Sequence, residues 1–247
     1  MLASVLRAGV AGAPPPASAQ QGEFVRLDER TWAFIDGGDA SSNGAILAGR
    51  DAALVVDPGL TPAGARRLLA QAETLSGVPV RWVVLTHWHP DHALGVTCLG
   101  YGAAAGGTGP AARAAQRPTV LAHPYTRRRL AEEAARTARS LARSLPADTG
   151  MGACRVHLPD AVVDTARWID LGGRRVRVFH PGRAHTPGDL VVWDPDGRTL
   201  AAGDEFMHAS SPSMGEGSAF VWRSVLDGLV ALEPRHVVAG HFGPSTP

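Results

Sequence analysis

The string at residues 86–92, Thr-His-Trp-His-Pro-Asp-His, places four possible metal ligands within six positions. The four are His87, His89, Asp91 and His92. Imidazole binds zinc, copper, iron and nickel, and a carboxylate adds a hard oxygen donor. The string directly follows residues 80–85, a short apolar run typical of a strand covered on both faces. Pro90 prevents a regular helix through the middle of the string, so we predict a turning loop whose side chains converge on one point.

The composition is that of an ordinary globular protein, with 45% hydrophobic and 19% charged residues in 247 positions. A formal net charge of +1 gives no electrostatic reason to expect a nucleic acid or an anionic membrane as partner. No apolar run approaches the roughly 20 residues of a membrane span. All 24 basic residues are arginine, which excludes chemistry that needs a lysine Schiff base. We expect a small-molecule substrate, and the oligomeric state stays open.

Residues 1–22 are expected to lie outside the folded domain, as a disordered Ala/Pro-rich leader or a signal peptide. Ala17-Ser18-Ala19 matches the small-residue pattern of a signal-peptidase site, and Arg7 supplies a positive charge. The apolar stretch is short and is broken by glycines and prolines, which favours a cytoplasmic protein over an exported one.

Cys98 and Cys154 are the only cysteines. Because a free cysteine behaves as a small buried hydrophobe, we expect two free thiols. Their spacing gives no argument for a disulfide between them.

Residues 23–247 are expected to form one domain in which strands and helices are interleaved. Thr61 and Pro62 mark one helix start, because they suit the cap and the first helical position. The other predicted helices are 126–145 and 222–232, and the predicted strands are 24–27, 32–35, 45–48, 52–56, 80–85, 119–122, 168–171, 175–179, 190–193, 199–202 and 236–239. Residues 100–118, rich in glycine and alanine, are predicted to form a loop or insertion. This order implies a layered α/β domain with mixed sheets.

The string at 87–92 matches the H-x-H-x-D-H signature of the metallo-β-lactamase fold superfamily. Four further motifs follow in that superfamily's order along the chain. They are Asp57 after the strand 52–56, His185 in Ala-His-Thr-Pro-Gly-Asp, Asp204 in Ala-Gly-Asp, and His241 in Ala-Gly-His after the last strand. Because five motifs agree in order, the chain resembles the superfamily over about residues 23–243.

The resemblance implies a four-layer αββα sandwich with the site at one edge of its two sheets. It implies one metal ion held by His87, His89 and His185, a second held by Asp91, His92 and His241, and Asp204 as a bridge between them. Asp57 would brace the loop of the site without touching a metal. The cofactor implied is Zn²⁺, two ions per chain, with iron or manganese as other candidates.

Two adjacent divalent ions can hold a shared water as hydroxide at neutral pH, because a metal lowers the pKa of that water from 15.7 towards roughly 7. They also stabilise negative charge on a carbonyl or phosphoryl oxygen. Asp91 could orient the hydroxide or handle a proton, so it is the candidate catalytic residue. The expected protein is a zinc-dependent hydrolase whose metal-bridged hydroxide attacks an ester, lactone, thioester or related bond.

The motifs do not identify the substrate, since one fold serves many reactions. The best-known β-lactamase classes lack an aspartate in the bridging position, so Asp204 argues against membership of those classes. A β-lactam-hydrolysing member nevertheless stays open as an alternative. Thioesterases that resemble glyoxalase II continue into a helical domain, whereas six residues follow His241 here. Lactonases share all seven ligands. Residues 184–243 are most similar to stand-alone bacterial hydrolases and more weakly similar to zinc hydrolases associated with quinoproteins.

Two other classes of function stay open. A mononuclear iron enzyme resembling persulfide dioxygenases would use the same fold with two histidines and one carboxylate. A non-catalytic binding protein would tolerate the loss of a ligand, and none is lost.

Trp88 is expected either to line the cleft or to pack, and Asp189 to brace either a turn or the site. The remaining histidines, at 123, 157, 180, 208 and 236, are expected to lie outside the site, with His208 the one that could enter the cleft.

Overall fold

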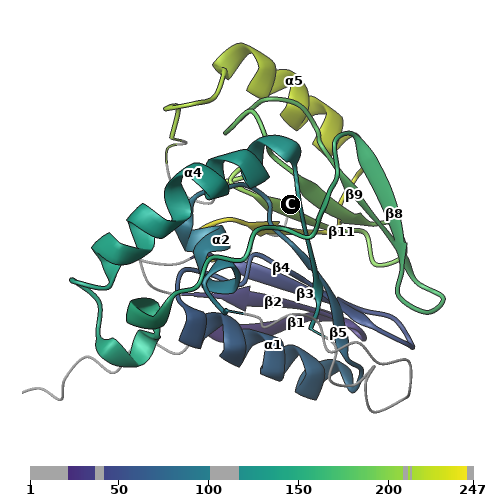
Figure 1. Cartoon of the computed structure of the whole chain (residues 1–247). Helices are drawn as coiled ribbons and strands as arrows, with labels where there is room; N and C mark the ends of the chain where they lie inside the picture. Colours follow the sequence, from purple (N-terminus) through teal and green to yellow (C-terminus); the bar gives the residue numbers. More distant parts are fainter. Residues whose placement is uncertain (1–21, 37–41, 101–116, 208–210, 212, 244–247) are drawn as a thin grey trace, which may run out of the picture.

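The structure is a computed structural model, and it describes residues 22–36, 42–100, 117–207, 211 and 213–243. Two β-sheets pack face to face, with helices on both outer sides (Figure 1). The first sheet has the strand order β1 (Glu23–Asp28), β2 (Thr31–Ile35), β3 (Gly44–Ala48), β4 (Ala53–Val56), β5 (Val80–Val84), β6 (Thr119–Ala122) and β7 (Ala161–Val162). The second has the order β12 (His236–Ala239), β11 (Thr199–Gly203), β10 (Val191–Asp194), β9 (Arg175–Phe179) and β8 (Ala166–Asp170).

Both sheets are mixed, as predicted. In the first sheet, β1 to β4 pair antiparallel and β4 to β7 pair parallel. In the second sheet, β8 to β11 pair antiparallel and β11 pairs parallel with β12. Three of the predicted ligand segments, which begin near His87, Asp204 and His241, follow the ends of β5, β11 and β12.

Three apolar layers hold the sandwich together. Alternate residues of the central strands serve different layers, because successive side chains of a strand point to opposite faces. In β4, Leu54 packs between the two sheets, and Val55 packs under the helices that cover the first sheet. Those helices are α1 (Pro62–Ser76), α2 (Pro90–Thr97) and α4 (Pro124–Leu141), and α5 (Ala219–Val230) covers the second sheet. The four-layer αββα sandwich is confirmed.

The helix ends follow local signals. Thr61 accepts a hydrogen bond from the amide of Gly64 at 3.1 Å, and Pro62 opens α1, as predicted. Gly77 ends that helix with φ of 70°, a left-handed conformation that suits glycine. Helix α4 begins earlier than predicted, where His123 Nδ1 accepts from the amide of Tyr125, and it also ends earlier.

The predicted turning loop is wrong in its second half. Helix α2 begins at Pro90, so Asp91 and His92 lie in its first turn. Proline is tolerated there because the first N–H groups of a helix have no partner inside the helix. Only His87 and His89 of the four ligands remain in the turn between β5 and α2.

The expectation of two free thiols is wrong, because Cys98 and Cys154 form a disulfide. Cys98 caps the C-terminus of α2, and Cys154 follows two 3-10 helices, η1 (Ala147–Thr149) and η2 (Met151–Ala153). Their Cα atoms lie 4.5 Å apart although 56 positions separate them in the sequence. Tertiary structure brings them together, so no local pattern could signal the bond.

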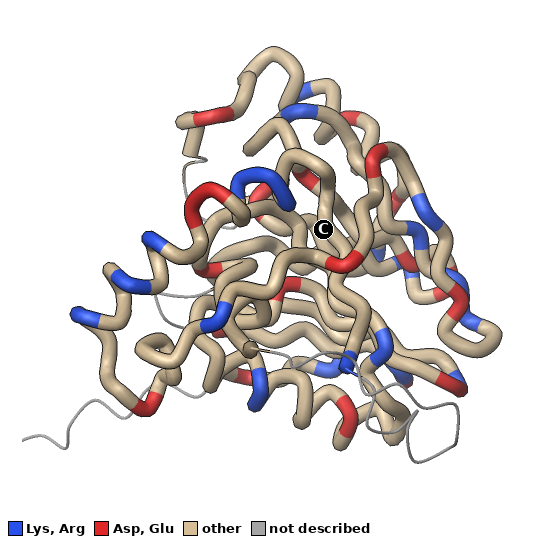
Figure 2. The backbone as a smooth tube through the Cα atoms, viewed as in Figure 1, with Lys and Arg blue, Asp and Glu red and all other residues tan. Residues whose placement is uncertain are grey.

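Some expectations concern residues outside the described part of the chain, namely the leader 1–21, residues 101–116 of the predicted loop, and His208. Among the residues that the structure describes, no helix is long and apolar enough to cross a membrane. Charges of both signs are interspersed over the visible elements (Figure 2). On α4, Arg129 pairs with Glu132 and Arg136 with Glu133, as expected of a solvated helix face.

Candidate metal centre

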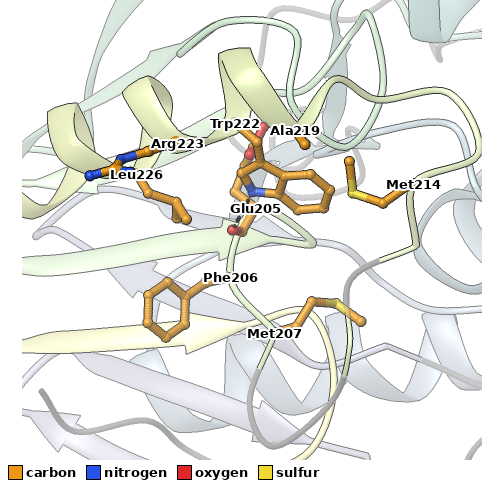
Figure 3. A pocket seen from close by; sticks show the side chains of 8 residues that line it. All are labelled: Glu205, Phe206, Met207, Met214, Ala219, Trp222, Arg223 and Leu226. Carbon is orange, nitrogen blue, oxygen red and sulfur yellow. Dashed lines mark hydrogen bonds between the residues drawn. The ribbon is translucent and has the colours of Figure 1, made fainter.

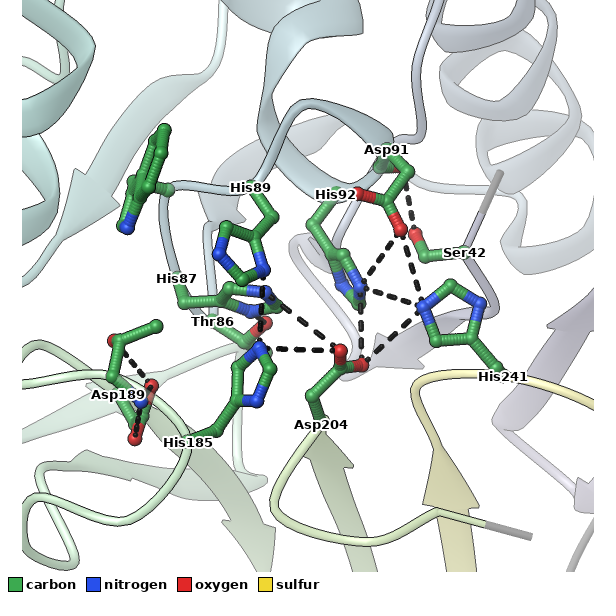
Figure 4. Close-up of polar contacts among 12 residues, drawn as sticks. Ser42, Thr86, His87, His89, Asp91, His92, His185, Asp189, Asp204 and His241 are labelled. Atoms are coloured by element: carbon green, nitrogen blue, oxygen red, sulfur yellow. Dashed lines mark hydrogen bonds and ion pairs between the residues drawn. The ribbon is translucent and has the colours of Figure 1, made fainter. Parts of the chain in front are cut away.

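All seven side chains predicted to bind metal meet at one edge of the two sheets (Figure 4). Their segments follow the ends of strands: His87, His89, Asp91 and His92 after β5, His185 between β9 and β10, Asp204 after β11, and His241 after β12. Their possible ligand atoms form two groups, in each of which all atoms lie within 4.8 Å of one another. The first group is His87, His89, His185 and Asp204, and the second is Asp91, His92 and His241.

The second group has the spacing of ligands around one tetrahedral ion. His92 Nε2 lies 3.3 Å from His241 Nε2 and 3.4 Å from Asp91 Oδ2, and the last two atoms are 3.1 Å apart. Asp204 Oδ1 joins them, 3.1 Å from His92 Nε2 and 3.5 Å from His241 Nε2. Tetrahedral zinc, with ligands about 2.0–2.2 Å away, separates those ligands by roughly 3.3–3.6 Å. The four atoms therefore fit one metal ion.

The first group shares Asp204 with the second. His185 Nε2 lies 3.0 Å from His89 Nδ1 and 3.4 Å from Asp204 Oδ2, and His87 Nε2 lies 3.9 Å from the same oxygen. Asp204 thus turns Oδ2 towards this group and Oδ1 towards the other. His87 Nε2 is buried and has no hydrogen-bond partner among the residues that the structure describes. A cation among these atoms would satisfy that nitrogen, so this donor set also fits a metal ion.

Asp57 determines which nitrogen two of the histidines present to the site. Its buried carboxylate accepts from the amide and the hydroxyl of Thr86, at 2.8 and 2.6 Å, and lies 2.8 Å from His92 Nδ1. Thr86 Oγ1 in turn lies 3.1 Å from His87 Nδ1. This pattern assigns a proton to each Nδ1, so each ring, once neutral, presents its Nε2 lone pair to a metal. Asp57 has the contacts expected of a residue that braces the site.

The protonation states of the histidines differ between the two groups of ligand atoms. Burial lowers the pKa of His87 well below its usual value and that of His89 to about 4, so both rings are neutral at neutral pH. Burial alone would raise the pKa of Asp91 and Asp204, but nearby histidines, above all His92, outweigh it and hold both values well below the usual range. The pKa of His92 is raised despite its burial, because carboxylates surround it. His87 and His89 can therefore bind a metal as they stand, whereas the pKa of His241 is raised like that of His92, so metal binding at these two rings would displace protons.

Ser42 and Asn43, which belong to none of the sequence motifs, hold the backbone of the second group. The amide and hydroxyl of Ser42 both donate to the carbonyl of Asp91, at 3.3 and 3.0 Å. The amide of Asn43 donates to the carbonyl of Gly240 at 2.7 Å, and its Nδ2 donates to that of Phe242 at 2.5 Å. The two residues directly precede β3, and both are buried. They fix the first turn of α2 and the turn that carries the last histidine against each other.

Two buried acids lie behind His185. Asp189 accepts from the amide and the hydroxyl of Thr186, at 2.8 and 2.5 Å, and thereby braces the turn that carries His185. Burial, followed by the charge of Asp189, raises the pKa of Glu205 to about 11, so Glu205 is a neutral acid at neutral pH. Glu205 directly follows Asp204, and no sequence motif had marked it.

An apolar cavity of about 460 Å³ opens between the end of β11 and α5 (Figure 3). It is lined by Glu205, Phe206, Met207, Met214, Ala219, Trp222, Arg223 and Leu226. None of the seven predicted ligands lines it, so it lies beside the candidate metal centre rather than over it. Trp222 stands between the two: its ring centroid is 5.8 Å from that of His185, and its indole N–H donates to the carbonyl of Glu205 at 3.0 Å. Trp222 belongs to the core under α5.

Comparison with known proteins identifies the family. Residues 37–241 match the family model described as the Metallo-beta-lactamase superfamily. A "Metallo-beta-lactamase type 2" from Bacillus sp. (strain 170) is 22% identical over 213 residues, which cover 83% of this chain and 69% of that protein. A metallo-beta-lactamase from Pontibacter korlensis has the same fold, with a TM-score of 0.68, 21% identity and coverage of 92% and 94% of the two chains. DIM-1 metallo-beta-lactamase, in a structure exposed to ceftazidime, gives a TM-score of 0.66, 19% identity and 93% coverage of each chain.

The family match spans most of the chain, including every motif from Asp57 to His241. The fold is the one that this resemblance implied, and the two groups of ligand atoms meet at the expected edge. The chain therefore belongs to the metallo-beta-lactamase superfamily.

Proposed function

We propose that this protein is a metal-dependent hydrolase that holds two divalent ions, zinc in the first instance, and opens an amide or ester bond with water. The observation that carries the proposal is the position of Asp204, whose two oxygens face two separate groups of ligand atoms. The proposed ligands are His87, His89 and His185 for one ion, Asp91, His92 and His241 for the other, and Asp204 for both. Such a set leaves coordination positions open for water and substrate, which a catalytic site needs.

When bound, two such ions supply hydroxide at neutral pH and stabilise the negative charge that develops on the attacked carbonyl oxygen. The chain's own residues supply order and a proton acceptor. Asp91 turns Oδ2 towards His92 and His241, which leaves its second oxygen to accept the proton of the attacking water. Asp91 can then return that proton to the leaving nitrogen or oxygen.

β-Lactams are the first substrates to test. The proteins of known structure that share this fold include β-lactamases, one of them exposed to the cephalosporin ceftazidime. A β-lactam is a strained cyclic amide, and its carbonyl carbon suits attack by hydroxide. Asp204 favours a second candidate class, namely lactones, esters or thioesters, because the best-known β-lactamase classes lack an aspartate in the bridging position.

A substrate panel tests the proposal and separates these classes. The panel holds a chromogenic cephalosporin, a penicillin, a lactone, a thioester and a phosphodiester, each offered to zinc-loaded and to chelator-treated protein. Turnover that chelation abolishes and added Zn²⁺ restores supports the hydrolase, and the substrate with the highest kcat/KM identifies the class. Turnover that survives complete metal removal contradicts the proposal.

An iron oxygenase that resembles persulfide dioxygenases is the alternative from another class. The second group of ligand atoms favours two ions over one, because a mononuclear site needs only the first group. Metal analysis of protein purified without added metal decides between them. One iron per chain together with oxygen uptake on a persulfide would replace the hydrolase proposal.

The disulfide bears on where the protein works. Disulfides persist in oxidising compartments and are rare in the cytosol. The bond between Cys98 and Cys154 therefore favours the exported alternative over the cytoplasmic one. Fractionation of the source organism with thiol labelling tests this: the oxidised protein should be found outside the cytoplasm, and a reduced cytoplasmic pool would contradict export.

A further inference from the structure

Glu216 lies just before α5, outside every helix and strand, and its carboxylate joins three parts of the molecule. Its Oε2 accepts hydrogen bonds from Trp88 Nε1 and from the hydroxyl of Tyr125, each at 3.1 Å. Its Oε1 lies 3.8 Å from the guanidinium of Arg129. The side chain is only 27% exposed. These contacts connect the histidine string, helix α4 and the segment before α5.

Trp88 transmits this contact to a metal ligand. It directly precedes His89 in the sequence, and the two rings meet edge to face, with centroids 4.9 Å apart. The guanidinium of Arg129 covers the indole at 4.3 Å, and Glu216 holds the indole N–H. An indole fixed in this way restricts the His89 imidazole, whose Nδ1 lies 3.0 Å from His185 Nε2.

The backbone around Glu216 is fixed beside the other ligand of this pair. The amide of Ser218 donates to the carbonyl of Ala184, the residue before His185, at 3.1 Å. Gly217 packs so closely on the same carbonyl that a Cβ there would collide with it. Glu216 is therefore anchored next to His185, and its side chain holds Trp88, the neighbour of His89. His89 itself lies 96 positions before His185 in the chain.

We propose that Glu216 is a positioning residue for the first metal ion: it fixes Trp88 against His89 while anchored beside His185, and so sets the zinc affinity of that site. The second group has separate supports in Ser42 and Asn43, so the effect should be confined to the first group. The inference rests on the proposed function, because it requires zinc in the first site.

Zinc affinities of single-site proteins test the role of Glu216. His241→Ala removes a ligand of the second group and keeps the first, and His89→Ala does the reverse. In the His241→Ala background, Glu216→Gln should weaken zinc binding about tenfold, the scale of losing an outer partner of a metal ligand. In the His89→Ala background it should leave the affinity unchanged. Competition with a chromophoric zinc chelator measures both.

Two further variants make the test specific. Glu133→Gln is the matched control, because it removes another carboxylate near Arg129, at 3.8 Å, while the contact of Trp88 with Glu216 remains. Trp88→Phe keeps a ring but removes the N–H, so it should reproduce the loss. The double variant with Glu216→Gln should lose no more zinc affinity than Trp88→Phe alone, since both substitutions weaken the single contact between Trp88 and Glu216.

Unchanged affinity in Glu216→Gln and Trp88→Phe would overturn the proposal, and so would an equal loss at both sites. If Glu216→Gln protein fails to fold, Trp88→Phe decides alone. Wild-type protein separates this inference from the proposed function. If wild type binds two zinc ions and hydrolyses its substrate while both variants match it, only the role of Glu216 is wrong. If wild type binds no zinc, both proposals fail.

Discussion

Asp91 and Asp204 are both ionised acids in the candidate centre, but their surroundings give them different roles. The side chain of Asp204 is 7% exposed, and both its oxygens face ligand nitrogens. The side chain of Asp91 is 28% exposed, and its Oδ2 faces His92 and His241. Asp204 therefore suits a bridge between two ions, and Asp91 suits exchange of a proton with a substrate.

Asp91→Asn tests this division at the level of one residue. The amide keeps an oxygen that can face His92 and His241 but cannot accept a proton as a carboxylate does. We expect kcat to fall about 10²- to 10⁴-fold, the usual range for general acid–base catalysis. Zinc content and the thermal midpoint should stay close to wild type. Steady-state kinetics, metal analysis and thermal unfolding measure the three quantities, and a loss of zinc in proportion to rate would show that Asp91 acts only as a ligand.

The seven candidate ligands could be predicted from the sequence because each lies in a short motif that follows a strand. Gly240 shows why such motifs are strict: a Cβ there would collide with Asp204 Oδ1. Asn43 and Glu216 could not be predicted in the same way. Asn43 reaches a carbonyl 199 positions away, and Glu216 reaches Trp88 across 128 positions. Contacts of that range leave no local pattern.

The elements with periodic apolar residues were predictable for a related reason, since that signal is local. Strands β2 and β9 have nearly the predicted bounds, and helix α1 begins at the predicted residue. Helix α2 was missed because its first turn coincides with the ligand string. Strand β7 has two residues and exists only by pairing with β6, so its own sequence carries little information.

Asp160 fastens β7 to the rest of the first sheet. It directly precedes β7 and accepts from the amide of Val120 in β6 at 2.9 Å and from the guanidinium of Arg117 at 2.7 and 2.8 Å. Burial alone would raise the pKa of Asp160, but these hydrogen bonds, that of Arg117 first, outweigh it and lower the pKa to about 2. Because this value lies below the ordinary 3.8, the ionised group stabilises the fold above about pH 4, and that stabilisation is lost as the pH falls towards 2.

Asp160→Asn should therefore lower the thermal midpoint at pH 7, and the difference from wild type should shrink as the pH approaches 2. Thermal unfolding of both proteins over this pH range, with a chelator present throughout, measures the difference without a contribution from bound metal. A difference that stays constant with pH would show that the charge of Asp160 is not what stabilises this edge of the sheet.

Over the whole molecule, the candidate ligands come from both halves of the sandwich. The first sheet and α2 supply His87, His89, Asp91 and His92, and the second sheet supplies His185, Asp204 and His241. Each ion would therefore bind both halves at once. Because a ligand that binds only the folded state stabilises it, removal of metal should lower the stability of the whole sandwich.

The disulfide acts on the same scale, because it ties the end of α2 to a segment 56 positions later. Closing a loop of that length restricts the unfolded chain, and such bonds contribute roughly 2–4 kcal/mol. We expect reduction by a phosphine to lower the unfolding free energy of the metal-free protein by this amount in denaturant titrations. The double variant Cys98→Ala/Cys154→Ala should unfold like the reduced protein and should not respond to the reductant. Identical unfolding of oxidised and reduced wild type would contradict this contribution.

An anomalous-scattering map recorded at the zinc edge from crystals of zinc-loaded protein shows whether two metal ions share Asp204. We expect two peaks roughly 3.5–4 Å apart. One should lie among His87, His89 and His185, the other among Asp91, His92 and His241, each about 2.0–2.2 Å from an oxygen of Asp204. A single peak, or two peaks with Asp204 in contact with only one of them, would contradict this expectation.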